Sequence, residues 1–193
     1  MLKKGNVRSS QVLLFARNFL KHPRAVGSII PSSPFLIRSM LSQVRWPAAR
    51  VVVEYGPGTG NVTREILARM APDATLISIE MNEEFVRNLS QRIHDPRLRL
   101  VRESAANVRD VLRRNGFESA DYIISSLPFA NMPITLRSQI LWESSQALGP
   151  DGAMVLYQYS PRLESSLEPI FERVDRDLVL RNFPPALCYR CSR

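Results

Sequence analysis

From residue 50 onward, short apolar runs alternate with longer segments in which apolar residues recur every three or four positions. Short runs rich in β-branched residues, such as RVVVEY at 50–55, are typical of buried strands, whereas the longer spacing is typical of amphipathic helices. The predicted strands cover 50–55, 75–80, 98–101, 121–129, 153–159, 177–183 and 186–191.

Helices are predicted between these strands, at 61–70, 82–93, 105–115, 134–148 and 163–171. Asn61 is expected to cap the first of them, because an Asn side chain can accept a hydrogen bond from the first turn. Gly116 ends the third helix, and Gly149 with Pro150 is expected to end the fourth. Two more helices, at 11–21 and 34–44, are predicted before the first strand.

Strands that alternate with helices form right-handed βαβ units, so the sequence predicts an α/β fold with a doubly wound, seven-stranded and mostly parallel sheet. The last two predicted strands are separated only by Pro184 and Pro185, which favours an antiparallel hairpin at the sheet edge. We expect a single domain over 1–193, with a helical N-terminal segment at 1–45 and an α/β core at 46–193. Its length and its 45% hydrophobic composition are those of an ordinary globular domain.

Charge divides the chain unevenly. The first 50 residues contain nine Lys or Arg and no Asp or Glu, whereas the other 143 residues contain 17 basic and 18 acidic residues. The net charge of +8 therefore belongs to the N-terminal segment. Such asymmetry favours an anionic partner, either a membrane surface or a nucleic acid, and a plain solubilising surface is the alternative.

The N-terminal segment also contains an apolar stripe at helical spacing, formed by Val12, Phe15, Ala16, Phe19 and Leu20. A basic helix with such a stripe can lie in a membrane interface, or it can pack on its own domain. No apolar run approaches the roughly 18 residues of a membrane span, and no signal-peptide cleavage site follows the stripe. We therefore expect an intracellular protein.

The candidate metal and redox residues are few. Cys188 and Cys191 have the spacing of a CxxC motif, but they fall in a predicted strand and not at the start of a helix, so we interpret them as ordinary strand residues. The only histidines are His22 and His94, which is too few for a zinc site with these cysteines. No metal centre is expected.

The strongest signal for a ligand is the stretch VVVEYGPGTGNVT at 51–63, where Gly56, Gly58 and Gly60 follow the first strand. Glycines there let the backbone turn tightly and let a ligand approach it. Glu80 ends the second strand, where an acid can accept hydrogen bonds from ribose hydroxyls. No Lys follows Gly60 as a P-loop requires, and Glu54 suits a ligand with a positive amino group better than a pyrophosphate.

The stretch VEYGPGTGNVT resembles motif I of the class I S-adenosylmethionine-dependent methyltransferases, which have a Rossmann-like fold. The resemblance implies S-adenosyl-L-methionine as the cofactor and Glu80 as the ribose ligand. After the third strand that family usually has Gly-Asp-Ala, whose Asp holds the adenine amine; here the residues are Glu103, Ser104 and Ala105, so Ser104 or Glu103 takes that role. The implied cofactor residues are Glu54, Gly56, Gly58, Thr59, Gly60, Glu80, Met81, Glu103, Ser104, Ala105 and Ser126.

Methyl transfer is a direct displacement that mainly requires alignment of the acceptor, so no catalytic triad is expected. In this class the segment at the end of the fourth strand, here SSLPF at 125–129, meets an acceptor amine. Ser126, Leu127 and Phe129 are the candidate catalytic residues: backbone carbonyls near Ser126 and Leu127 could accept from the amine. The ring of Phe129 could attract a developing ammonium.

Two stretches on either side of the core motifs indicate a more specific family. FLKHPRAVGSIIPSSP at 19–34 and RNFPPALCYR at 181–190, together with SSLPFANMP, resemble the small bacterial phospholipid N-methyltransferases, which methylate phosphatidylethanolamine. The resemblance implies a phospholipid substrate, an anionic membrane surface as partner, and a cytoplasmic enzyme peripherally bound to the inner face of the membrane. It also places Gly27, Ser28 and Ser33 near the substrate entry or the methionine end of the cofactor.

Two other functions remain open. An rRNA adenine N6-dimethyltransferase shares the core and would explain the basic charge, but its acceptor loop begins with Asn or Asp where this chain has Ser126. Such enzymes also carry a helical domain after the sheet, whereas 41 residues follow Gly152 here. RNA is therefore the less favoured partner. A non-catalytic binding module on the same scaffold is the third hypothesis, against which the intact glycines and Glu80 argue.

Overall fold

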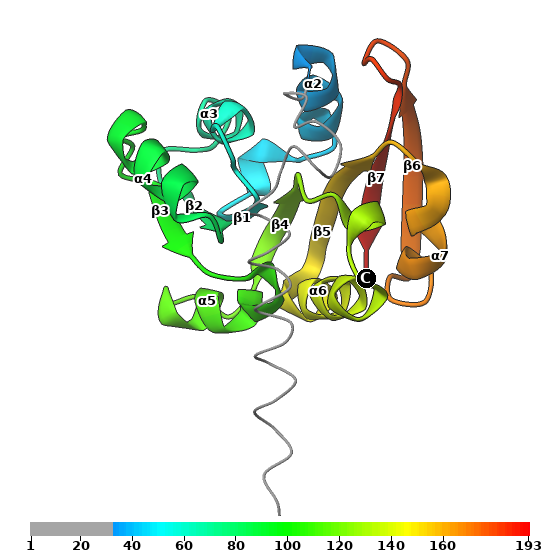
Figure 1. The fold of residues 1–193 in the computed structure, drawn as a ribbon. Helices are drawn as coiled ribbons and strands as arrows, with labels where there is room; N and C mark the ends of the chain where they lie inside the picture. The colour runs from blue at the N-terminus through cyan, green and yellow to red at the C-terminus, as the bar shows by residue number, and fades with distance from the viewer. Residues whose placement is uncertain (1–32) are drawn as a thin grey trace, which may run out of the picture. The chain divides into compact units, whose positions relative to one another are not determined.

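A computed structural model describes residues 33–193 and shows one mixed sheet with helices on both faces (Figure 1). The sheet has seven strands in the order β3-β2-β1-β4-β5-β7-β6. Only the pairings of β7 with β5 and with β6 are antiparallel, which confirms the predicted doubly wound sheet and its C-terminal hairpin. The strands are β1 (Val51–Tyr55), β2 (Thr75–Glu80), β3 (Leu98–Arg102), β4 (Ala120–Ser125), β5 (Leu148–Gln158), β6 (Arg173–Val179) and β7 (Ala186–Ser192).

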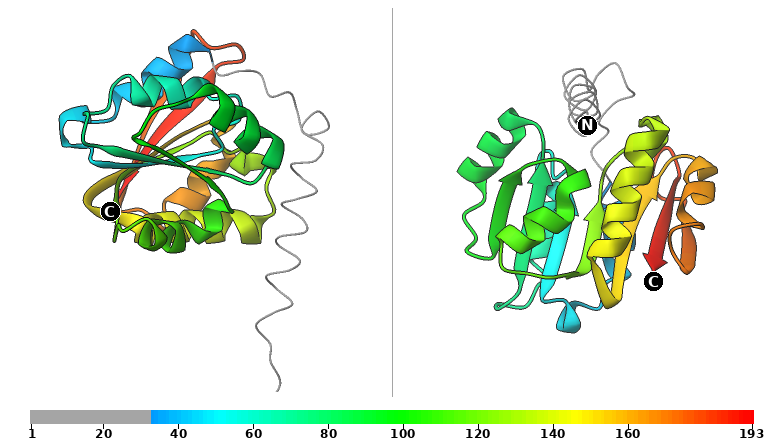
Figure 2. Two further views of the ribbon diagram at one scale, coloured as in Figure 1. Left: turned by 90° about the vertical axis from the view of Figure 1, so that its left-hand side faces the viewer. Right: turned by 90° about the horizontal axis from the view of Figure 1, so that it is seen from below.

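The helices form two layers (Figure 2): α2, α3 and α4 cover one face of the sheet, and α5, α6 and α7 cover the other. Short 3-10 turns, at η2 (Trp46–Ala48), η3 (Ala105–Asn107), η4 (Phe129–Asn131) and η5 (Pro161–Leu163), join several of the elements. The helices are α2 (Pro34–Ser42), α3 (Asn61–Leu67), α4 (Glu83–Arg92), α5 (Val108–Arg114), α6 (Ile134–Ala147) and α7 (Glu164–Leu167).

The core explains why the central strands are so apolar. Strand β1 lies between β2 and β4 with helices on both faces, so Val52, Val53 and Tyr55 are all fully buried. One core cluster joins Val52 to Leu36 of α2 and to Ile66 of α3. Helix α2, which the sequence analysis assigns to the N-terminal segment, thus packs on the sheet, while the proposed division of the chain at residue 45 stays a prediction.

Several predicted boundaries were wrong. The strand predicted at 121–129 is β4, which ends at Ser125. Gly149 and Pro150 do not stop a helix outside the sheet, because α6 ends at Ala147 and β5 begins at once, with Leu148 paired to Ala120. The register of β4 and β5 then shifts before Tyr122 meets Ala153, so the glycine and proline lie in an irregular part of the strand. The helix predicted at 163–171 is limited to α7, and the strand predicted at 177–183 is β6, which begins at Arg173.

The capping residue predicted for α3 was also wrong. Gly60, with φ of +83°, is the N-cap, and Asn61 is already the first helical residue. The tight turn of the glycine loop requires a left-handed residue immediately before the helix, which displaces the capping position by one residue. Asn82, predicted as the first residue of the helix at 82–93, instead caps α4 through its side chain.

Several predictions concern residues 1–32, which lie outside the described residues: the helix at 11–21 with its apolar stripe, and Gly27 and Ser28. In the described part of the chain no helix is long and apolar enough to cross a membrane. Across residues 33–193 no cluster of acidic, His or Cys side chains suited to a metal ion is found. Cys188 and Cys191 are free, buried residues of β7, as predicted for strand positions.

Candidate functional site

The glycine loop leaves the carboxyl end of β1, and two of its glycines serve different purposes. Gly58 has φ of +53°, and a Cβ atom built on it would meet no other atom within 4 Å. Gly60 has φ of +83°, and its Cβ would come within 2.5 Å of Leu89 in α4. Gly60 is therefore required by packing, whereas Gly58 keeps open a space in front of the loop.

Glu80 holds the loop from the end of β2. The side chain is 5% exposed, and its Oε2 accepts a hydrogen bond from the backbone N–H of Gly58 at 3.3 Å. Its Oε1 accepts from the N–H of Asn82 at 2.9 Å. Burial raises the pKa of Glu80, and these backbone hydrogen bonds oppose the rise. A carboxylate with two oxygens and about four lone pairs can accept further donors from a ligand at this edge.

Glu54 is fully buried behind the same loop, between β2 and α3. The hydroxyl of Ser78 donates to its Oε2 at 2.6 Å, and the hydroxyl of Thr63 donates to the same oxygen at 2.9 Å. Burial raises the pKa of Glu54 to about 7, because the two hydroxyl hydrogen bonds only partly offset the loss of hydration. A neighbouring cation would therefore shift Glu54 towards its ionised form.

The next strand end carries the residues predicted at the adenine position. Glu103 accepts hydrogen bonds from the N–H of Ser104 at 2.9 Å and from Asn107 at 3.0 Å, and it pairs with Arg114 at 3.3 Å. Although burial alone would raise the pKa of Glu103, these partners lower it overall. Ser104 is buried and caps η3 by accepting from the N–H of Ala106 at 3.2 Å.

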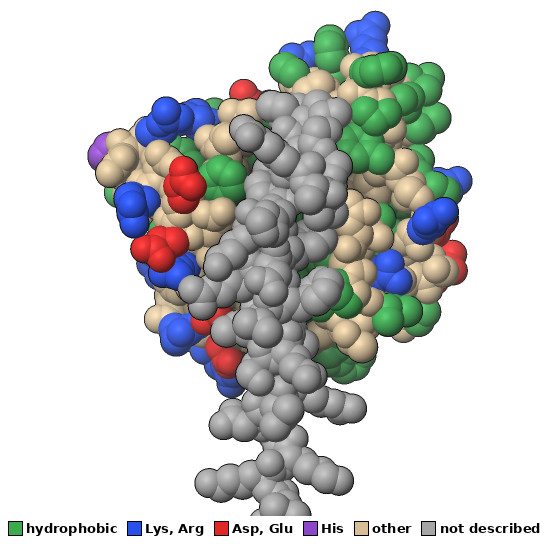
Figure 3. Space-filling model, viewed as in Figure 1, with side chains coloured by type: hydrophobic (Ala, Val, Ile, Leu, Met, Phe, Trp, Pro, Cys, Tyr) green, Lys and Arg blue, Asp and Glu red, His purple; other side chains and the backbone are tan. Residues whose placement is uncertain are grey.

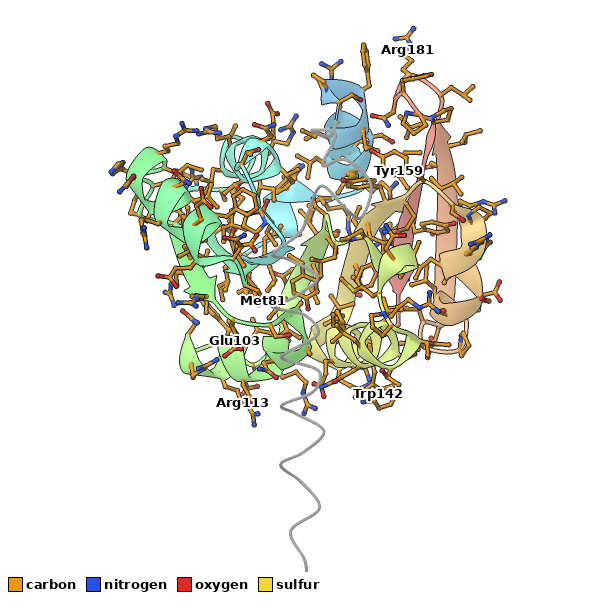
Figure 4. The ribbon with its side chains drawn as sticks, in the orientation of Figure 1. Met81, Glu103, Arg113, Trp142, Tyr159 and Arg181 are labelled. Atoms are coloured by element: carbon orange, nitrogen blue, oxygen red, sulfur yellow. The ribbon has the colours of Figure 1, made fainter. Side chains whose placement is uncertain are left out.

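The structure brings the predicted cofactor residues of three strands together at one edge. Strands β1, β2 and β3 are parallel neighbours, and the N–H of Glu103 donates to the carbonyl of Glu80 at 3.2 Å. Figure 4 shows Met81 and Glu103 close together at this edge. Thr59 lies exposed in the glycine loop, and Ala105 is buried in η3.

The acceptor loop, defined here as residues 126–131, follows β4 at the same edge. The N–H of Ser126 donates to the carbonyl of Tyr55 at 3.0 Å, so the loop starts beside the glycine loop. The Leu127 side chain lies 3.1 Å from the position of a Cβ on Gly56. The Oγ of Ser126 is buried and has no hydrogen-bond partner among the described residues, which is uncommon for a buried hydroxyl.

Gln158, which the sequence analysis did not single out, fixes the acceptor loop. It ends β5 and is 4% exposed; its Nε2 donates to the carbonyl of Leu127 at 3.0 Å, and its Oε1 accepts from the N–H of Ala130 at 3.1 Å. The N–H of Phe129 also donates to the Leu127 carbonyl at 3.0 Å. That carbonyl therefore already has two donors, and the Ser126 carbonyl is the better placed of the two predicted amine acceptors.

The other predicted acceptor-side residues lie in different surroundings. Phe129 is fully buried, so its ring packs inside the domain and offers no exposed face to a ligand in this conformation. Ser33 caps α2, because its hydroxyl accepts from the N–H of Leu36 at 3.2 Å. A role for Ser33 at the substrate entry and a role for Phe129 in attracting the acceptor both stay predictions.

Chemically, the site combines two buried carboxyl groups, an open approach over Gly58 and an unpartnered hydroxyl at Ser126. Such an arrangement fits a ligand that carries both hydroxyl donors and a cationic group.

Comparison with known proteins shows to which proteins this chain is similar. The family model of the methyltransferase domain matches residues 52–152. An ornithine lipid N-methyltransferase of Singulisphaera acidiphila is 33% identical over 180 residues, which cover 92% of this chain and 94% of that protein. A probable dimethyladenosine transferase of Drosophila melanogaster is 25% identical over 73% of this chain but only 41% of its own length.

Among solved structures, the 1,6-didemethyltoxoflavin-N1-methyltransferase of Burkholderia thailandensis has the same fold. Its TM-score is 0.68 at 15% identity, and the match covers all of this chain and 93% of that one.

Proposed function

The chain belongs to the S-adenosylmethionine-dependent methyltransferases of class I, and from that premise we propose that it methylates the amine of a membrane lipid head group. Phosphatidylethanolamine is the first candidate substrate and an ornithine lipid is the second. The observation that carries the proposal is the match to an ornithine lipid N-methyltransferase over nearly the full length of both chains. When bound, the cofactor supplies an electrophilic methyl group on a sulfonium centre.

The residues present fit that cofactor. Gly58 leaves open the approach that a side chain would fill, and Glu80 offers carboxylate oxygens to ribose hydroxyls. Glu54 is the candidate partner of the methionine amino group, because a cation nearby would favour its charged form. Ser104, or Glu103 beside it, is the candidate for the adenine amine.

The acceptor loop is proposed to hold the lipid amine. The carbonyl of Ser126 and its unpartnered hydroxyl can accept hydrogen bonds from the amine N–H groups and so aim the nitrogen lone pair at the methyl carbon. Gln158 acts as a positioning residue, since it ties the Leu127 carbonyl and the Ala130 N–H to the end of β5. Bound beside this loop, the cofactor would supply its methyl group to the nitrogen, which would then release one proton.

An RNA substrate is the weaker alternative. The match to a dimethyladenosine transferase spans less than half of that protein, whereas the lipid enzyme is matched over 94% of its length. The acceptor loop also begins with Ser126, which lacks the side-chain amide or acid expected for a flipped adenine.

A lipid substrate requires that the enzyme reach a membrane surface, and the basic residues at 1–32 are proposed to favour an anionic one. Basic residues near an anionic leaflet contribute about 1 kcal/mol each. Replacing Lys3, Lys4, Arg8, Arg17 and Lys21 with Gln should reduce binding to anionic vesicles at low salt and leave cofactor affinity unchanged. The proposed location is therefore the inner face of the cytoplasmic membrane.

Incubation with methyl-labelled S-adenosylmethionine and separate lipid and RNA extracts tests the proposed substrate class. We expect label in the lipid fraction, and none when Gly58→Val protein is used. Label confined to the RNA fraction would transfer the assignment to the RNA alternative. Cofactor binding without label in either fraction would favour the non-catalytic module.

A further inference from the structure

We propose that the tip of the β6–β7 hairpin, together with the start of α2, is a second membrane contact that inserts apolar side chains into the bilayer interface. The inference rests on the proposed function, because a lipid substrate implies a bilayer partner. The hairpin–α2 surface is defined by Phe35, Tyr159, Leu178, Leu180, Arg181 and Phe183.

Large apolar side chains are unusually exposed here. Phe183 is 90% exposed, Leu180 is 71% exposed and Leu178 is 59% exposed, and Phe35 and Tyr159 are each 44% exposed. Figure 3 shows apolar side chains gathered over α2 and the hairpin at the upper right of the molecule. Single exposed apolar residues are common on soluble proteins, but a gathered group of this kind marks an interaction surface.

Two contacts join the hairpin to α2. The guanidinium of Arg181 lies 5.6 Å from the centre of the Phe35 ring, which is a cation–π distance. Lower on the hairpin, the amide of Gln43 donates to Asp177 at 3.3 Å. The two elements are thus held side by side, as Figure 1 also shows, and can present one surface to a partner.

The strand register places this surface at the edge where the candidate site lies. Gln158, at the carboxyl end of β5, pairs with Leu187 of β7, and Val179 of β6 pairs with Ala186. The turn at 180–185 therefore projects from the same sheet edge as the acceptor loop, which Gln158 binds. Tyr159 follows Gln158 directly, and Figure 4 shows Tyr159 and Arg181 at the upper right of the molecule.

Two hydrogen bonds of Asn182 hold the turn together. Asn182 is 4% exposed, and its Nδ2 donates to the carbonyl of Pro184 at 2.6 Å. Its N–H donates to the carbonyl of Val179 at 3.4 Å. The two prolines have no N–H to satisfy. Leu180 and Phe183 are consequently presented by a turn that the hydrogen bonds of Asn182 hold in shape.

The charges favour an anionic bilayer over a protein surface of mixed charge. No Asp or Glu occurs between Leu178 and the C-terminus, or between residue 33 and Val53, whereas Arg38 and Arg181 flank the apolar side chains. Arginine can extend its charged group to lipid phosphates while its stem lies along apolar surface. In the sequence, the basic segment at 1–32 directly precedes Ser33, the cap of α2.

Vesicle sedimentation of the full-length double variant Leu180→Gln/Phe183→Gln tests the proposal. The matched control is Ile134→Gln/Trp142→Gln, which replaces two exposed apolar residues of α6 with the same side chain. Vesicles of equal phosphatidylcholine and phosphatidylglycerol are used at low salt and at about 1 M salt, where the Debye length falls to about 3 Å. Thermal melting and cofactor calorimetry verify that each variant is folded.

We expect the hairpin variant to lose at least tenfold in vesicle partitioning at high salt, where the basic segment is screened, and the α6 control to match the parent. Methylation of a short-chain lipid dissolved as monomers should stay at the parental rate in the hairpin variant, while methylation of vesicle lipid falls. Equal partitioning of the hairpin variant and the parent would overturn the proposal. A dimer that the hairpin variant abolishes, with no change in vesicle binding, would overturn it in favour of a second copy of the chain.

Different results would contradict the proposed substrate and the proposed membrane-contact surface. If the parent binds vesicles through the hairpin but methylates neither monomeric nor vesicle lipid, the lipid-methylation function is wrong and the membrane contact stands. If the parent methylates both lipids and the hairpin variant does so equally, the function stands and the contact is wrong.

Discussion

The side-chain amide of Gln158 donates to the carbonyl of Leu127 across 3.0 Å and thereby ties the end of β5 to the acceptor loop. Gln158→Leu removes this donor and also the acceptor of the Ala130 N–H. The Leu127 carbonyl keeps the N–H of Phe129, whereas the Ala130 N–H loses its acceptor at a cost of about 1–3 kcal/mol, so we expect lower stability and a looser loop. The turnover number should fall while cofactor affinity, measured by calorimetry, stays near the parental value.

Gln158→Glu separates positioning from packing, since it keeps an oxygen for the Ala130 N–H and loses the donor to the carbonyls of Leu127 and Tyr157. Its turnover should lie between those of the parent and of Gln158→Leu. A Gln158→Leu protein with parental turnover and altered cofactor affinity would show that Gln158 serves the cofactor side instead.

Gly58→Val should abolish cofactor binding and leave the fold intact, because the new side chain would occupy the open space over the loop. Gly116→Val is the matched control: Gly116 also has a positive φ and open space around its Cβ, but it lies after α5, away from the site. A left-handed non-glycine residue costs about 1–2 kcal/mol, so both variants should melt somewhat lower. Parental cofactor affinity in a folded Gly58→Val protein would remove the loop from the site.

Glu80→Ala should weaken cofactor binding by about 1.5–3 kcal/mol, the range for a hydrogen bond to a charged group. Glu83→Ala is the control, because Glu83 lies three residues further on, is exposed and pairs with Arg87 and Arg102. Isothermal titration calorimetry with S-adenosylhomocysteine measures both variants. No change on Glu80→Ala, or an equal loss on Glu83→Ala, would contradict the ribose assignment.

The buried carboxyl of Glu54 should make stability fall with rising pH. Its pKa is raised by burial from 4.5 to about 7, so the folded state holds the proton more tightly than the unfolded state. Stability from this group is thus complete below pH 4.5 and is lost as pH rises towards 7, by up to about 3 kcal/mol. Urea denaturation at pH 5 and pH 8 measures the loss.

The variant Glu54→Gln carries no charge, so its stability should change less between pH 5 and pH 8 and should exceed that of the parent at pH 8. The raised pKa of Glu80 acts in the same direction and accounts for any remaining slope. A parental pH slope in Glu54→Gln would assign the effect to other groups.

The pattern of apolar and polar residues was sufficient to predict the fold where the local conformational preference of a segment agrees with its tertiary packing. The run Val51–Tyr55 is buried on both faces and followed by glycines that the loop requires, so strand, loop and fold class could be predicted together. The start of β5 at Leu148 could not be predicted from the sequence. Pairing of Leu148 with Ala120 draws Gly149 and Pro150 into the sheet, although glycine and proline are locally disfavoured in strands.

The acceptor side of the site was less accessible from sequence. A single Gln at a strand end has no distinctive pattern, and Gln158 contacts Leu127, 31 residues earlier in the chain, so only the folded sheet reveals it. The same holds for Phe129, whose complete burial follows from packing of the loop and not from its neighbours in sequence. Glycine and acid positions were predictable because their spacing follows from the strand–loop–helix geometry itself.

The central claim is that this chain transfers methyl groups to a lipid amine. Its most direct test is mass spectrometry of the lipid after incubation of the purified full-length protein with S-adenosylmethionine and vesicles that contain phosphatidylethanolamine or an ornithine lipid, with Gly58→Val protein as the control. The account predicts an N-methylated head group in at least one of the two lipids with the parent and none with the variant. Unmodified lipid in both vesicle types, from a protein that binds the cofactor, would contradict it.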